Sequence, residues 1–196
     1  MPLGAFKAAL MGTAGATAAG DVVLLHDTDY SGAATASITS GFTSTYVEYI
    51  FRFYNINPAT DGQKFLFNGS IDGGSNYNVT KTTTNMTAYQ GEDGSDPTLK
   101  YYGGDDLAQG TGFLPLTAII GNGADESTAG ELHLFNPSGP TYVKHFYSRL
   151  HDYNSGDYSL EVYAAGYFNN TDNIDAVQYK MESGNFDGTI KLWGVK

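Results

Sequence analysis

The chain has 196 residues, 41% of them hydrophobic, which is enough for one domain with a real core and too apolar for a disordered chain. The absence of cysteine excludes a disulfide scaffold, a cysteine-based zinc site and thiol catalysis, and it suits a reducing cytosol. A formal net charge of −11 repels nucleic acid and anionic membranes, so neither is an expected partner.

Residues 1–20 are rich in Ala and Gly, and Ala16-Thr17-Ala18 imitates a signal-peptide cleavage site. No basic residue precedes the apolar stretch, and Lys7 falls inside it, which disfavours a secretory signal. We expect residues 1–20 to form an N-terminal arm, clamped by its own domain or by a neighbouring subunit. The apolar side chains expected to anchor this arm at an interface are Leu3, Phe6, Leu10 and Met11.

From about residue 21 apolar and polar residues alternate, and turn residues recur at short intervals, which predicts β-strands. Residues 45–54 place Val47, Tyr49, Phe51 and Phe53 on one face of a half-buried strand. The next strand is expected over residues 63–71, and a long Thr-rich extended segment over residues 77–89. We expect Phe65, Phe67 and Ile71 to point inward.

Residues 90–112 are the least regular part of the chain, and they predict one long loop interrupted by a short strand at residues 99–102. The later strands are expected at residues 113–120, 131–135, 142–150, 158–168, 174–181 and 189–195. The pattern thus predicts about nine to ten strands and no convincing helix.

The chain ends in a predicted strand that carries the only tryptophan, Trp193, after predicted turns at residues 183–185 and at Asp187-Gly188. A strand that ties down a terminus is expected to close a sheet, and we assign Trp193 and Tyr179 to the core. An all-β chain of this size is expected to form a two-sheet jelly roll or β-sandwich over residues 21–196. Aromatics on both faces of several strands indicate burial on both sides or a surface that meets another subunit.

No catalytic, cofactor-binding or metal-binding residue is predicted. The histidines lack metal-ligand spacing, and no serine lies in a nucleophile motif; the histidines are His26, His133, His145 and His151. Residues 152–157 have part of the oxygen spacing of a calcium loop but lack its downstream bidentate Glu, so a hairpin turn is favoured.

Two groups of side chains leave alternatives open. The acidic residues of the long loop could hold a hard cation, although solvated acidic loops are commoner; they are Glu92, Asp93, Asp96, Asp105 and Asp106. Tyr101, Tyr102 and Tyr153 could stack on sugars, or they could be ordinary sheet aromatics.

The C-terminal sequence SGNFDGTIKLWGVK, residues 183–196, resembles the terminus of many small tailed-phage virion proteins. Further similarity to this family runs through residues 42–61 and 70–77 and covers roughly residues 25–196 in all. These motifs are turns and strand ends, so they specify a fold better than a function. The resemblance implies a jelly-roll protein of the particle, either on the capsid or on the tail.

The leading hypothesis is a non-enzymatic capsid decoration (cement) protein that is assembled in the host cytoplasm and located in the virion. Its expected partners are the major capsid protein and copies of itself, as a homotrimer, without cofactors, nucleic acid or membrane. The alternative is a tail fibre or adaptor component, or a host-surface carbohydrate-binding module, with a glycan as partner if the protein lies in the tail. An enzyme is disfavoured because no pair of acids stands out.

Overall fold

Alternating inward and outward side chains build twelve strands over residues 21–196, the part of the chain that the computed structural model describes, and this part contains no helix. The strands are β1 (Val22–Ala33), β2 (Ala36–Ile38), β3 (Glu48–Pro58), β4 (Phe65–Ser70), β5 (Lys81–Gly91), β6 (Thr98–Tyr101), β7 (Leu114–Pro115), β8 (Thr128–Phe135), β9 (Lys144–Asn154), β10 (Tyr158–Phe168), β11 (Ala176–Met181) and β12 (Phe186–Val195).

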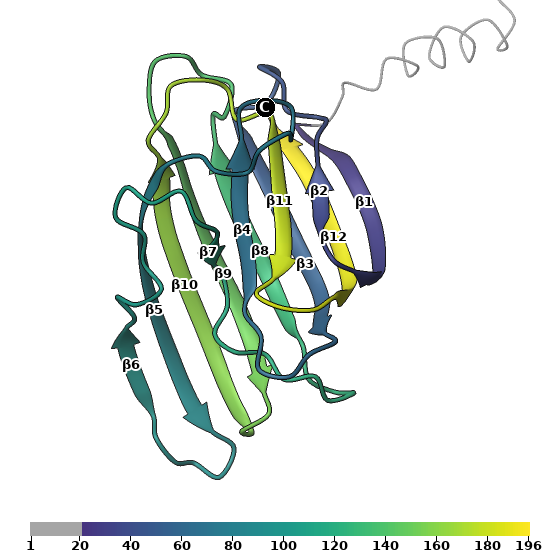
Figure 1. Cartoon of the computed structure of the whole chain (residues 1–196), viewed down its shortest axis with the longest axis vertical. Coiled ribbons are helices and arrows are strands. Elements are labelled where there is room, and N and C mark those ends of the chain that lie inside the picture. Colours follow the sequence, from purple (N-terminus) through teal and green to yellow (C-terminus); the bar gives the residue numbers. More distant parts are fainter. Residues whose placement is uncertain (1–20) are drawn as a thin grey trace, which may run out of the picture.

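The strands form two antiparallel sheets that pack face to face (Figure 1). The large sheet has the order β1-β12-β3-β8-β9-β10-β5-β6, and the small sheet has the order β2-β11-β4-β7. We call the face of the large sheet that meets the small sheet its inner face, and the opposite face its outer face. The predicted all-β, two-sheet sandwich is therefore confirmed.

Aromatic rings from both sheets fill the space between them. Tyr179 of β11 is fully buried, as predicted, and its ring stacks on Phe65 and Phe67 of β4 at centroid distances of 5.6 and 5.5 Å. Its edge meets Phe51 and Phe53 of β3, which belongs to the large sheet. Each such pair adds about 0.5–1.5 kcal/mol to the stabilisation from burial, so this cluster joins the two layers.

Trp193 lies outside the core, so its predicted placement is wrong. In β12 the buried positions include Ile190 and Leu192, and the alternation turns Trp193 to the outer face, where it is partly exposed. It pairs there with Leu24 of β1 and Ile50 of β3. The parity of its neighbours along the strand, and not the size of the side chain, decides which face it occupies.

Several local predictions are also wrong. Asp187 and Gly188 form a β-bulge inside β12 against β3 instead of a turn. Within the predicted strand 113–120, only Leu114–Pro115 is a strand. Ile71 was expected to point inward but is 39% exposed, and Val47, which was predicted to share the face of the buried Tyr49, is 57% exposed. Both residues lie just beyond the ends of their strands.

The long irregular segment was predicted correctly, with β6 as its short strand, and it has a structural role. The loop that follows β6 runs along the edge of β5, where the Thr83 backbone amide donates to the carbonyl of Leu107 and the Thr83 hydroxyl accepts from the Leu107 amide at 2.8 Å. The side chains on the buried face of β5 are mostly polar, and Thr83 is one that finds its partner in this loop. At one end of this face Lys81 is fully buried and donates to Asn68 and to the carbonyl of Val79.

Candidate functional site

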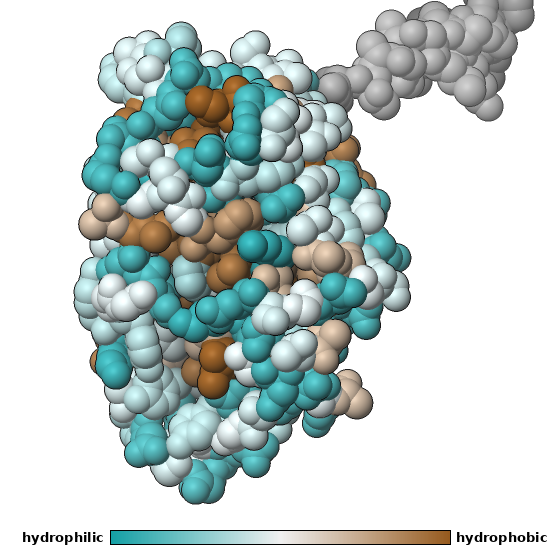
Figure 2. Space-filling model, viewed as in Figure 1, coloured by the Kyte–Doolittle hydropathy of each residue, from teal (hydrophilic) through white to brown (hydrophobic). Residues whose placement is uncertain are grey.

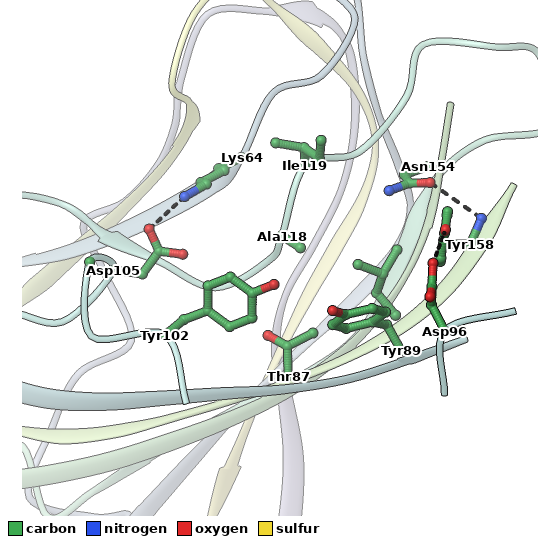
Figure 3. Close-up of a pocket in the computed structure, with 12 residues that line it drawn as sticks. Lys64, Thr87, Tyr89, Asp96, Tyr102, Asp105, Ala118, Ile119, Asn154 and Tyr158 are labelled. Atoms are coloured by element: carbon green, nitrogen blue, oxygen red, sulfur yellow. Dashed lines mark hydrogen bonds and ion pairs between the residues drawn. The ribbon is translucent and has the colours of Figure 1, made fainter. Parts of the chain in front are cut away.

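A cavity of about 480 Å³ opens between the inner face of β5 and β10 and the loops that follow β6 and β7 (Figure 3). Three tyrosines line it, Tyr89 of β5, Tyr102 just after β6 and Tyr158 at the start of β10. We call this cavity the tyrosine pocket. Its size falls in the range of small-molecule sites in proteins.

Contacts on both sides fix the tyrosine rings. Tyr89 and Tyr158 meet edge to face at a centroid distance of 6.1 Å, and the Tyr158 hydroxyl donates to Asp96 at 3.0 Å. The Tyr102 backbone amide donates to the carbonyl of Asn85, and the Lys100 ammonium lies 4.8 Å from the centre of the Tyr102 ring. The aromatic wall is therefore held in place before any ligand arrives.

Polar groups lie at the two ends of the pocket (Figure 3). At one end Lys64 forms an ion pair with Asp105, with 2.5 Å between Nζ and Oδ1. At the other end Asn154 accepts hydrogen bonds from the amides of Gly156 and Tyr158 through Oδ1, at 3.0 and 3.3 Å. These bonds turn the Asn154 amide nitrogen toward the pocket, as Figure 3 shows.

A buried carboxyl group holds the wall formed by Ala118 and Ile119. Asp152 of β9 is fully buried, and its Oδ2 accepts from the backbone amide of Ala118 at 2.8 Å. The other oxygen, Oδ1, has no hydrogen-bond partner among residues 21–196. Burial raises the pKa of Asp152 to about 8, so the carboxyl is largely protonated at neutral pH. Asp152 thus positions one wall of the pocket without carrying a full charge.

The pocket contains one of the three tyrosines that the sequence marked as candidates for sugar stacking. Tyr102 lines it. Tyr101, the preceding residue, points to the outer face of the large sheet, and its hydroxyl bonds to Asp106. Tyr153 of β9 bonds through its hydroxyl to Asp157, also away from the pocket.

The acidic residues of the long loop are divided among different places. Asp96 and Asp105 line the tyrosine pocket. Glu92 and Asp93 line a separate depression beside the turn between β9 and β10, and Asp106 bonds to Tyr101.

Residues 152–157 contain the β9–β10 hairpin turn, as favoured from the sequence, with Asn154 paired to Tyr158. Because the Asp152 side chain is buried between the sheets, it does not face this turn. Within residues 21–196 no group of three or more His, Cys, Asp or Glu side chains is arranged to hold a metal ion.

Sequence reasoning missed most of the pocket. Tyr89, Asn154 and Lys64 come from three segments that are far apart in the chain, and no spacing links them. The one available signal was parity, because Tyr89 shares the inward face of β5 with Thr87.

A second candidate surface is the outer face of the large sheet. Along it Leu24, Trp193, Ile50, His133 and Tyr147 are cross-strand neighbours in that order, from β1 to β9. His133 stacks on Tyr147 at 4.6 Å. The row continues into a shallow groove lined by apolar and aromatic side chains of β10, β5 and β6, namely Tyr163, Met86, Leu99 and Tyr101. We call the residues named here the outer band.

The opposite side of the molecule differs. On the face that carries the small sheet, hydrophobic residues form separate patches among hydrophilic ones (Figure 2). The predicted interface anchors Leu3, Phe6, Leu10 and Met11 lie in residues 1–20, outside the described part of the chain, and they stay a prediction.

No family model, no curated protein and no solved structure matches the chain. Among residues 21–196 there is no helix with the length and hydrophobicity needed to span a membrane.

Proposed function

We propose that the protein is a non-enzymatic structural component of a tailed-phage particle, and specifically a capsid decoration protein. The observation that carries this proposal is the outer band, which crosses the large sheet from its edge strand β1 to its opposite edge β6. Leu24 and Tyr147 are 48% and 43% exposed within it. Exposed apolar surface that is continuous over many strands is typical of a protein–protein contact.

Charged pairs beside the outer band support the same reading. Arg52 pairs with Glu131 at 3.4 Å, and Arg149 pairs with Glu161, all on the outer face. A surface with apolar residues next to charges of both signs can set the orientation of a partner as well as bind it. From the sequence resemblance alone we also propose that the sandwich belongs to the jelly-roll class.

The mechanism is mechanical. Copies of the protein, grouped as homotrimers, bridge neighbouring subunits of the major capsid protein and resist the pressure of the packaged genome. An ordinary interface buries about 1,600 Å² in total. Because many symmetric copies act together, modest contacts of this kind become strong through multivalency.

The second candidate is a tail fibre or adaptor component, or a binder of host-surface carbohydrate. The tyrosine pocket favours it, because bridging capsid subunits does not require a pre-formed cavity.

Copy number in purified particles separates the two candidates. Quantitative mass spectrometry is expected to find on the order of hundreds of copies per particle if the protein decorates the capsid, since copies at symmetric lattice positions scale with the capsid subunits. About a dozen copies or fewer would place it in the tail and overturn the decoration role.

Deletion of residues 2–19 is expected to lower occupancy while residues 21–196 stay folded. Full occupancy of the deleted protein would contradict the role of the arm.

A further inference from the structure

We propose that the tyrosine pocket binds a neutral saccharide of one or two hexose or N-acetylhexosamine units. This inference deepens the second candidate function, but it depends on the pocket alone and not on where the protein sits in a particle. The first support is shape and size. The cavity of about 480 Å³ is open to solvent along one side and lies between fixed loops, so a small ring-shaped ligand can enter without a change in the fold.

The second support is the aromatic wall. A hexose presents one face of C–H groups, and an aromatic ring presents an electron-rich face that attracts them. Tyr89 lies in β5, and Tyr102 directly follows the neighbouring strand β6. Both side chains line the same cavity. The Lys100 ammonium covers one face of the Tyr102 ring and is not part of the lining, which leaves the other face and the hydroxyl edge for a ligand.

The third support is the set of polar groups at the two ends. Neighbouring hydroxyl groups on a sugar act as both donors and acceptors, and they match a carboxylate beside an ammonium or an amide. Asp105 and Lys64 supply an acceptor and a donor at one end. At the other end Asn154 presents its amide nitrogen, because its Oδ1 is already occupied by two backbone amides. A purely apolar ligand would leave the Asn154 amide nitrogen without a partner and would cover the Lys64–Asp105 ion pair without adding a hydrogen bond to it.

The charge of the site argues for a neutral sugar. The lining contains two carboxylates, Asp96 and Asp105, and one lysine, Lys64. The whole chain has a net charge of −11. A uronic acid, a sialic acid or a phosphorylated sugar would therefore be repelled over the whole approach to the pocket.

The test uses the isolated full-length protein. A glycan array of neutral mono- to tetrasaccharides and of uronic- and sialic-acid oligosaccharides is probed first, and the best ligand is then titrated by calorimetry. Binding is expected to neutral members only. Tyr102→Ala is expected to weaken it about tenfold or more, since one stacking contact is lost. Tyr101→Ala is the matched control, because Tyr101 is the neighbouring tyrosine and points to the opposite face.

A second, nearly isosteric variant separates loss of binding from loss of the fold. Asp105→Asn keeps the shape of the side chain and removes its charge, and it is expected to weaken binding several-fold. Because the change also removes the ion-pair partner of Lys64, a small fall in melting temperature is expected, and binding is measured well below it. The proposal is overturned if no neutral saccharide binds at about 1 mM, if only acidic sugars bind, or if Tyr101→Ala weakens binding as much as Tyr102→Ala. Copy number in particles is measured without any sugar. If no saccharide binds, the decoration proposal therefore still stands, and if the copy number contradicts decoration, the saccharide proposal still stands.

Discussion

Asp152 shows how one buried side chain couples the pocket to the stability of the fold. It is fully buried, holds the amide of Ala118, and has a pKa of about 8 instead of the ordinary 3.8. Below about pH 4 the carboxyl is protonated in both the folded and the unfolded chain. Between about pH 4 and pH 8 the unfolded chain releases a proton that the folded chain retains, so folding stability from this group is lost as pH rises through this window.

Asp152→Asn removes this titration and keeps an oxygen for the Ala118 amide. We expect the free energy of unfolding of the wild type to fall relative to the variant between pH 5 and pH 8, by on the order of 1 kcal/mol per pH unit. Urea denaturation at several pH values measures the difference. Asp61→Asn, at an exposed position, is the control. Parallel pH profiles of wild type and Asp152→Asn would contradict the assignment.

Lys81 explains why the variant and the wild type must be compared at each pH. Burial lowers the pKa of Lys81 to about 7 from the ordinary 10.5. The unfolded chain therefore binds more protons than the folded chain between about pH 7 and pH 10.5, and the cost of this group disappears as pH rises through that window. As pH rises, Asp152 lowers the free energy of unfolding and Lys81 raises it. A pH profile of the wild type alone would contain both effects.

At the scale of single elements, β12 depends on a glycine at its bulge, Gly188. Gly188 has a φ of +140° within the bulge, and a Cβ atom there would lie 2.9 Å from the carbonyl oxygen of Asn55 and 2.6 Å from a methyl carbon of Ile56. The bulge adjusts the register of β12 against β3, the second and third strands of the large sheet counted from β1. Any side chain at this position must displace the backbone of the neighbouring strand.

Gly188→Ala is expected to destabilise the protein by about 3 kcal/mol, from backbone strain together with overpacking. Gly62→Ala is the matched control, because Gly62 has a φ of +68° but no atom within 4 Å of its would-be Cβ. Strain alone is expected there, at about 1 kcal/mol. Chemical denaturation of both variants gives the comparison. If both variants lost the same free energy of unfolding, the contact of the added methyl group with β3 would contribute nothing to the destabilisation.

Strands with uninterrupted alternation could be predicted from the sequence. The range 158–168 agrees with β10 at both ends, and the short strand in the long loop lies within one residue of β6. Residues 113–120 have the composition of a strand, but beyond Pro115 this segment makes only scattered backbone hydrogen bonds, to Phe65 at the start of β4 and to Gln63 before it. Strand propensity describes a residue, whereas sheet pairing depends on a partner that lies elsewhere in the chain.

The tyrosine pocket was beyond prediction for the same reason. Its lining is assembled from the ends of strands and from loops whose proximity depends on the order of strands in the large sheet. Tyr102 was the only lining tyrosine marked beforehand, and Asp96 and Asp105 were marked only as possible cation ligands. Tyr101 was an equal candidate for sugar stacking until the register of β6 against β5 set it on the face opposite to Tyr102.

At the scale of the whole molecule, the two faces of the sandwich predict different responses to substitution. Leu24→Lys combined with Tyr147→Lys places two charges in the outer band without touching the core. Occupancy on particles is expected to fall several-fold, because burying an unpaired charge at an interface is costly. Mass spectrometry of purified particles measures it, and an unchanged melting temperature shows that the fold is intact.

Ser37→Glu is the control for this pair, because it adds a charge on the exposed side of β2 in the small sheet. We expect this variant to occupy particles as the wild type does. If instead Ser37→Glu lowers occupancy and the outer-band variant does not, the contact lies on the small sheet, and the outer band has been assigned the wrong role.

The outward position of the single tryptophan gives the molecule a built-in optical probe. Trp193 is the only indole in the chain and lies partly exposed next to Leu24 and Ile50. A neighbour that covers the outer band would remove water from this ring and shift its fluorescence emission to shorter wavelength. A sugar in the tyrosine pocket, on the other side of the sheet, would leave the spectrum unchanged. Emission from unlabelled protein can therefore separate assembly from ligand binding in the same cuvette.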